Sequence, residues 1–159
     1  MSTGDIYNAR KVDDRLLTSG QPTEEQLRAA AAEGYDTVIN LAPHDNDNAL
    51  PDEAGLVRAL GMGYHHVPVV WTNPTERDFA AFEQVMAGLP ADSRTLVHCA
   101  ANFRVSAFYG LYAMKHLGWT AERAQAFRAS VWDVTEYPVW DAFVSLLQQQ
   151  AVSPRTTGG

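Results

Sequence analysis

Short apolar runs alternate along the chain with segments of helical spacing, and this alternation limits the possible folds more than any other feature. The runs at 36–42, 64–70 and 94–98 have the continuous Val, Ile and Leu content of strands buried on both faces. Residues 15–20 predict a further short strand. Helical patterns lie between and after these runs, at roughly 23–33, 51–60, 75–89, 103–117, 120–130 and 138–150. The alternation predicts an α/β domain with a mainly parallel, four- to five-stranded sheet flanked by helices, whose ligands bind beyond the carboxyl ends of the strands.

Size and composition predict one soluble domain. The chain has 159 residues, and we expect 1–150 to form the domain and 151–159 to be a disordered tail. No apolar run reaches the roughly 18 residues that a bilayer span needs, and the opening MSTGDIYNARKVDD lacks the apolar segment of a secretory signal. We therefore expect a cytoplasmic protein without membrane contact. The net charge of −7, without clustered Lys and Arg, predicts no nucleic-acid partner. The oligomeric state stays open.

The single cysteine, Cys99, rules out an internal disulfide. Together with five scattered histidines it also leaves no zinc-binding spacing, so we expect neither a metal nor another cofactor. Taken alone, Cys99 would be interpreted as a small buried hydrophobic residue. Its surroundings favour a functional role.

Cys99 lies in the stretch LVHCAANFRVS, at the carboxyl end of a predicted strand and about four residues before a predicted helix. Backbone N–H groups of such a loop and of the helix N-terminus converge on one point and bind anions. The same field favours a thiolate, and Arg104 adds a charge that can donate two hydrogen bonds to an oxyanion. We therefore expect Cys99 to be a nucleophile beside a phosphate site. That site would be formed by Ala100, Ala101, Asn102, Phe103 and Arg104.

The segment HCAANFR resembles the signature loop of the cysteine-dependent protein tyrosine and dual-specificity phosphatases. The stretches LLTSGQPTEEQL, VINLA and YHHVPVVWTNPTERDF are similar to the short bacterial dual-specificity-like branch of that superfamily, so the resemblance covers roughly residues 10 to 145. It implies a phosphatase-like domain that hydrolyses phosphomonoesters in two steps, without a metal, through a phosphocysteine on Cys99. The implied substrate is a phosphotyrosine protein or a small aryl phosphate.

Two features depart from the phosphatase pattern. Four residues separate Cys99 from Arg104 where the family has five, and the usual loop glycine is absent, although Asn102 tolerates a left-handed conformation. Val105 follows Arg104, while Ser106 has the spacing from Cys99 that the family's hydroxyl has. We therefore expect Ser106 to bond the sulfur and to assist its departure in the second step.

Two other functions fit the same loop. A Cys, four residues and an Arg also occur in rhodanese-type sulfurtransferases, which carry a persulfide on the cysteine. A pseudophosphatase that only binds phosphate is the other alternative. His98, the SGQP stretch and the PVVW strand end resemble the phosphatases and favour phosphatase activity.

The general acid is harder to place. Trp71 and Asn73 occupy the loop where the phosphatase pattern has an Asp. We favour Asp45, which follows a strand whose carboxyl end lies at the same sheet edge as Cys99. The other carboxylates considered are Glu76, Asp78, Asp133 and Glu136, of which Asp78 is explained as the capping partner of Thr75. Without a working acid, aryl phosphates would be favoured over alkyl phosphates.

Overall fold

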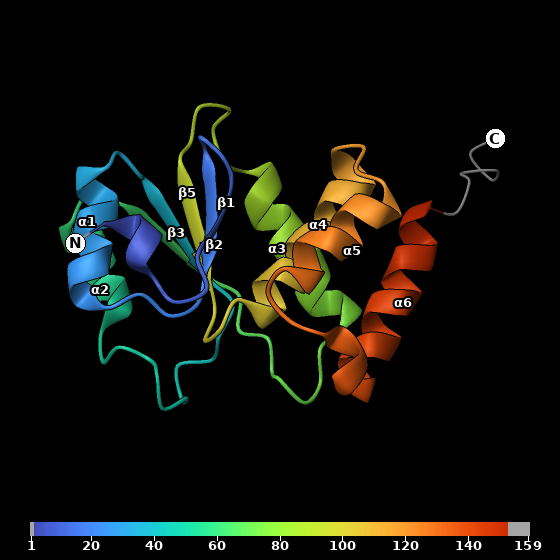
Figure 1. Cartoon of the computed structure of the whole chain (residues 1–159). Helices are drawn as coiled ribbons and strands as arrows, with labels where there is room; N and C mark the ends of the chain where they lie inside the picture. The colour runs from blue at the N-terminus through green and yellow to red at the C-terminus, as the bar shows by residue number, and fades with distance from the viewer. Residues whose placement is uncertain (1, 153–159) are drawn as a thin grey trace.

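A five-stranded sheet forms the centre of the computed structural model, which describes residues 2–152 (Figure 1). Its strands are β1 (Arg10–Asp13), β2 (Leu16–Ser19), β3 (Thr37–Asn40), β4 (Gly63–His66) and β5 (Thr95–His98). They lie in the order β1-β2-β5-β3-β4, with β1 antiparallel to β2 and the other neighbours parallel. The predicted α/β fold with a mainly parallel sheet is confirmed.

The four parallel strands end at the same level of the sheet. Ser19 pairs with His98, His98 with Asn40, and Asn40 with His66. The loops that follow these residues therefore leave the sheet at one level, along its lower side in Figure 1. Segments that are far apart in the sequence meet at this edge.

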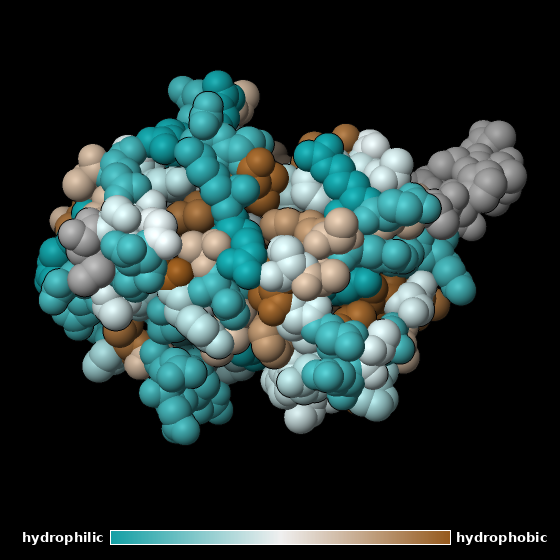
Figure 2. All heavy atoms as spheres, in the orientation of Figure 1, coloured by the Kyte–Doolittle hydropathy of each residue, from teal (hydrophilic) through white to brown (hydrophobic). Residues whose placement is uncertain are grey.

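Helices cover both faces of the sheet (Figure 1). They are α1 (Glu24–Ala32), α2 (Glu53–Ala59), α3 (Glu76–Ala87), α4 (Phe103–His116), α5 (Ala121–Ala129) and α6 (Pro138–Val152), with short 3₁₀ turns at Thr3–Asp5 (η1) and Val134–Glu136 (η2). The alternation of side chains along a strand divides the core. Val38 and Leu96 pack toward α1 and α2, whereas Ile39 and Val97 pack in the larger cluster with α3, α4 and α6. In Figure 2, apolar side chains reach the surface mainly in patches between the sheet and this larger group of helices.

Local signals in the sequence set several helix ends. Thr23 and Gln26 exchange side-chain to backbone hydrogen bonds at the start of α1, and Thr75 and Asp78 do the same at α3. Pro138 occupies the first position of α6, where a missing N–H costs nothing. These three starts agree with the predictions.

Three expectations need correction. The apolar run 64–70 is not a buried strand: β4 ends at His66 on the sheet edge, where Gly63 and His65 are exposed. Strand β1 was not predicted, because its residues RKVD are polar and only alternate residues are partly buried. Helix α6 runs to Val152, past the expected end of the domain at residue 150, and the rest of the predicted tail, 153–159, lies outside the described residues.

The helices in the described part of the chain are all too short or too polar to cross a membrane.

Asp36 ties the start of β3 to the start of β5. Its carboxylate accepts hydrogen bonds from the Arg94 N–H (3.0 Å), the Ser93 hydroxyl (2.7 Å) and the Thr37 hydroxyl (2.7 Å). Limited burial alone would raise the pKa of Asp36, but these hydrogen bonds and the Arg94 charge outweigh it and lower the pKa below 3.8. A carboxyl whose pKa falls on folding stabilises the native state above its unfolded pKa, and this contribution is lost as the pH falls through the folded value.

Replacement Asp36→Asn is therefore expected to lower the free energy of unfolding by about 1 kcal/mol at pH 7, a value reduced for solvent exposure. The difference from the wild-type protein should shrink steadily below about pH 4. Urea unfolding at a series of pH values measures it. Asp47→Asn, in an exposed loop, is the control. A difference that stays constant down to pH 2.5 would contradict the interpretation.

Candidate active site

Cys99 follows β5, the central strand of the sheet. Its N–H donates to the Ser19 carbonyl of β2 at 3.3 Å, and the His98 carbonyl accepts from the Leu41 N–H after β3 at 2.8 Å. These bonds hold residues 98 and 99 in the sheet up to the point where the loop begins. The position of Cys99 is therefore set by the backbone of three strands.

The loop after Cys99 is held from outside by its carbonyl groups. The Ala100 carbonyl accepts from the Gln21 N–H and the Ala101 carbonyl accepts from the Asn8 side-chain amide, both at 3.0 Å. Gly20 lies against the same loop: a Cβ added there would come within 2.7 Å of the Ala100 oxygen. With these carbonyls engaged by the N-terminal segment, the loop packs closely on residues 8 to 21.

Asn102 ends the loop in the left-handed conformation, with φ at 69°. Asparagine is the residue type other than glycine that best tolerates this conformation. Its side-chain amide donates to the Asn8 carbonyl at 2.9 Å and to the Thr18 hydroxyl at 3.1 Å. Helix α4 then begins at Phe103, with no side chain capping its first turn. The N–H groups of that turn thus remain available to an anion.

Arg104 is a buried cation. Its side chain is 7% exposed, Nη1 donates to the Val69 carbonyl at 3.0 Å, and the buried Nε has no partner among residues 2–152. The guanidinium carbon lies 5.7 Å from the centre of the Trp71 ring. No carboxylate of the described residues forms an ion pair with it. Since an unpaired buried charge is costly, this arrangement favours binding of an anion.

A hollow of about 290 Å³ connects Arg104 with the cysteine. It is lined by Trp71, Cys99, Ala100, Ala101, Phe103, Arg104 and Tyr137. Cys99 lies on its wall, although its side chain has no exposed area in this structure. Four of the five residues expected at the phosphate site therefore line this hollow together with Cys99, whereas the fifth, Asn102, is buried and does not line it.

Ser106 does not have the expected role in this structure. Its hydroxyl donates to the Phe103 carbonyl at 3.1 Å and accepts from the Trp132 ring N–H at 3.0 Å. The single hydroxyl hydrogen is thus used within α4, and Ser106 anchors Trp132 instead of bonding the sulfur. Phe103 stacks on Trp132, with ring centres 4.7 Å apart.

The carboxylates considered as general acid do not line the hollow. Asp45, the favoured one, is exposed in the loop after β3, and Glu136 is exposed as well. Asp78 caps α3, and Asp133 caps η2 through Thr135. Glu76 accepts a hydrogen bond from Gln150 in a different part of the molecule. The structure therefore places none of these five carboxylates against Cys99.

Glu53 is a buried carboxylate that the sequence did not reveal as part of the site. It contacts His98 Nε2 at 2.5 Å and accepts from the Gln21 amide at 2.8 Å. Burial alone would raise the pKa of Glu53, but the hydrogen bond and charge of His98 outweigh it and lower the pKa. The other ring nitrogen of His98 lies 3.2 Å from the Cys99 carbonyl oxygen. His98 thus connects the buried Glu53 to the start of the loop.

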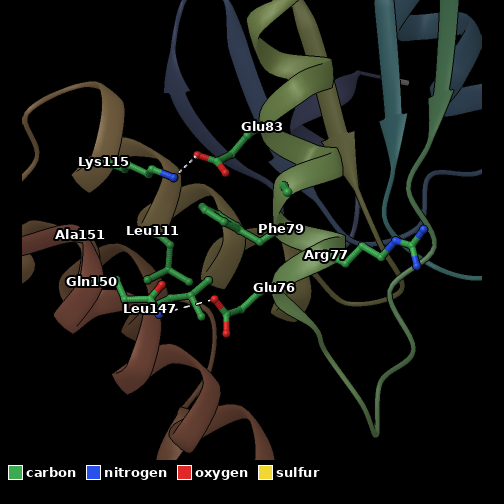
Figure 3. A pocket seen from close by; sticks show the side chains of 10 residues that line it. Glu76, Arg77, Phe79, Glu83, Leu111, Lys115, Leu147, Gln150 and Ala151 are labelled. Atoms are coloured by element: carbon green, nitrogen blue, oxygen red, sulfur yellow. Dashed lines mark hydrogen bonds and ion pairs between the residues drawn. The ribbon is translucent and has the colours of Figure 1, made fainter.

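A larger hollow, of about 560 Å³, lies between α3, α4 and α6 (Figure 3). Its sides are joined by a Glu83–Lys115 ion pair at 2.9 Å and a Gln150–Glu76 hydrogen bond at 3.4 Å, and Arg77 points away from it. Its lining residues include no cysteine, serine, threonine or histidine. It does not compete with the Cys99 hollow as a reactive site.

The fold defines the class of structure, which is a phosphatase-like α/β domain. TpbA from P. aeruginosa, solved in complex with pTyr, is 14% identical, with a TM-score of 0.70 over 97% of this chain and 94% of that one. At this identity the likeness concerns the fold.

The chain belongs to the family described as beta-lactamase hydrolase-like protein, phosphatase-like domain, whose model matches residues 8–115. A beta-lactamase hydrolase-like protein of Xylella fastidiosa strain 9a5c is 30% identical over 152 residues, which are 92% of this chain and 33% of that protein. The chain thus spans about a third of the length of this relative. A DUF442 protein from Shewanella putrefaciens CN-32, named as a candidate phosphatase, is 35% identical with a TM-score of 0.85, over 93% of this chain and 95% of that one.

Asn102 offers a test of how the loop is held. Asn102→Gly removes two hydrogen bonds but keeps the left-handed backbone free of strain, whereas Asn102→Ala removes the same bonds and adds steric strain of about 1–2 kcal/mol. We expect both variants to be less stable than the wild-type protein in urea unfolding, and Asn102→Ala to be the less stable of the two. Equal stability of the two variants would show that the loop changes conformation when the side chain is removed.

Proposed function

We propose that the protein is a phosphomonoester hydrolase that acts through a phosphocysteine on Cys99. In the first step the sulfur forms a bond to phosphorus while the ester P–O bond breaks, and the leaving oxygen keeps the electron pair and takes a proton from water. In the second step a water oxygen attacks phosphorus, the S–P bond breaks, and the sulfur leaves as a thiolate with release of inorganic phosphate. A nucleophilic thiol must stay reduced, which agrees with the cytoplasmic location we expect.

The observation that carries the proposal is the unpaired Arg104 beside Cys99. A phosphate in the hollow would neutralise a cation that has no carboxylate partner and would give the buried Nε a hydrogen-bond acceptor. The uncapped N–H groups of the first turn of α4 would add donors to the same anion. Bound phosphate would then lie where in-line attack by Cys99 is possible.

The absence of a carboxylate from the lining of the hollow affects which phosphate esters can react readily. Without a carboxylate at the wall, the leaving oxygen departs with a negative charge or with a proton from water, and phenols leave more readily than aliphatic alcohols because they are stronger acids. We therefore propose aryl phosphates, including phosphotyrosine, as the preferred substrates over alkyl phosphates. The relatives' printed names and the pTyr complex of TpbA support the same class.

Cys99→Ser is expected to abolish hydrolysis of p-nitrophenyl phosphate, and the wild-type activity should persist in EDTA. A continuous absorbance assay measures both. Thiocyanate formation from thiosulfate and cyanide, with no phosphate ester hydrolysis, would favour the rhodanese-type alternative. Absence of both activities in a protein whose melting temperature still rises with phosphate would indicate a pseudophosphatase.

Arg104→Met is expected to raise the stability of the ligand-free protein by about 1–2 kcal/mol, because an apolar side chain replaces an unpaired buried charge. The same change should remove the rise in melting temperature that inorganic phosphate gives the wild-type protein. Thermal unfolding with and without phosphate measures both effects. Arg128→Met, on α5, is the matched control and should keep the phosphate effect. A variant that still responds to phosphate would contradict the role of Arg104.

A further inference from the structure

A second, shallower hollow lies beside the catalytic one. It has a volume of about 160 Å³ and is lined by Trp71, Thr72, Tyr137, Pro138, Val139 and Trp140. Trp71 and Tyr137 line both hollows, so the two adjoin at these rings. The segments that carry them, the loop after β4 and the start of α6, come close together in Figure 1.

The walls of the second hollow are fixed in place. Trp140 is 1% exposed and its ring N–H donates to the Trp71 carbonyl at 2.7 Å. The Trp71 and Trp140 rings stack with centres 5.3 Å apart, and Tyr137 meets Trp71 edge to face at the same distance. Because the backbone and rings hold one another, this surface is formed before any substrate binds.

The surface of the second hollow is apolar and carries no charge. None of its lining residues is ionised near neutral pH, and Arg104 is the only cation that lines either hollow. Val139 and the neighbouring Val70 are 53% and 52% exposed, which is unusual for valine and leaves apolar area open to solvent. An acidic group on the substrate would find no counter-charge here, whereas an apolar group would lose its contact with water.

From this geometry we infer that the second hollow is a subsite for an apolar group carried by the leaving group, beyond the ring attached to the phosphate. The inference rests on the proposed function and specifies its substrate class: aryl phosphates with a second apolar or aromatic group. A third hollow also borders the loop, through Ala100 and Ala101, but it contains neither Cys99 nor Arg104, and its lining mixes apolar residues such as Leu50 with the polar Gln21 and the acidic Glu24. We therefore place the apolar part of the leaving group in the second hollow, beside Val139.

The test compares kcat/KM for phenyl phosphate and 4-biphenylyl phosphate, whose phenols are of similar acidity. Partial burial of the second ring should give the wild-type protein a preference of about tenfold for the biphenylyl ester. Val139→Gln should reduce this preference to about twofold or less, while kcat/KM for phenyl phosphate changes less than twofold.

Leu146→Gln is the matched control, because Leu146 is on the same helix, is 46% exposed and lines neither hollow. This variant should keep the wild-type preference. A wild-type protein that hydrolyses both esters equally well, or a preference that survives Val139→Gln, would overturn the subsite while leaving the proposed function intact. Failure to hydrolyse either ester, or hydrolysis that persists in Cys99→Ser, would instead overturn the proposed function and, with it, this inference.

Discussion

The central position of β5 is the constraint on which the site depends. β5 pairs with β2 on one side and β3 on the other. The three strands end at the same level, at Ser19, His98 and Asn40. The residue after His98 therefore has no freedom to move along the sheet. Its loop meets the loops from β2 and β3 at one edge, which is where α/β folds place their ligand sites.

The chemistry of the site follows from a charge that the protein leaves unbalanced. Arg104 is held by the Val69 carbonyl and the face of Trp71, two partners that orient a guanidinium without neutralising it. A carboxylate in their place would make the ligand-free protein more stable, but it would compete with phosphate for the guanidinium. Function and stability thus oppose each other at this residue.

The sequence predicted those features that depend on short-range patterns. The alternation of strands and helices and the cap at Thr75 depend on residues within a few positions of one another. The loop with Cys99 and Arg104 was also predicted, since both residues lie in one short segment.

In contrast, the pairing of Glu53 with His98 joins residues 45 positions apart, and the bond from Asn8 to Ala101 joins residues 93 apart. Such contacts depend on the packing of the whole sheet, which no local pattern specifies. The same reason applies to Asp45, which does not line the hollow although its loop follows a strand that ends at the same sheet edge: a shared edge does not determine where an exposed loop turns.

The contact between Asn8 and the loop has a consequence for how the protein loses its function. Asn8 exchanges two hydrogen bonds with residues 101 and 102, so part of the site belongs to the N-terminal segment and not to the helical core. Residues 7–15 are exposed or half-buried, and segments with so little buried area open locally at a lower free energy than the core does. An opening of this segment would disorder the anion loop while the sheet and the helices stay folded. Docking of the segment around Asn8 would then limit how long the anion loop stays ordered, and hydrogen exchange at the amides of 99–103 would follow that docking instead of global unfolding.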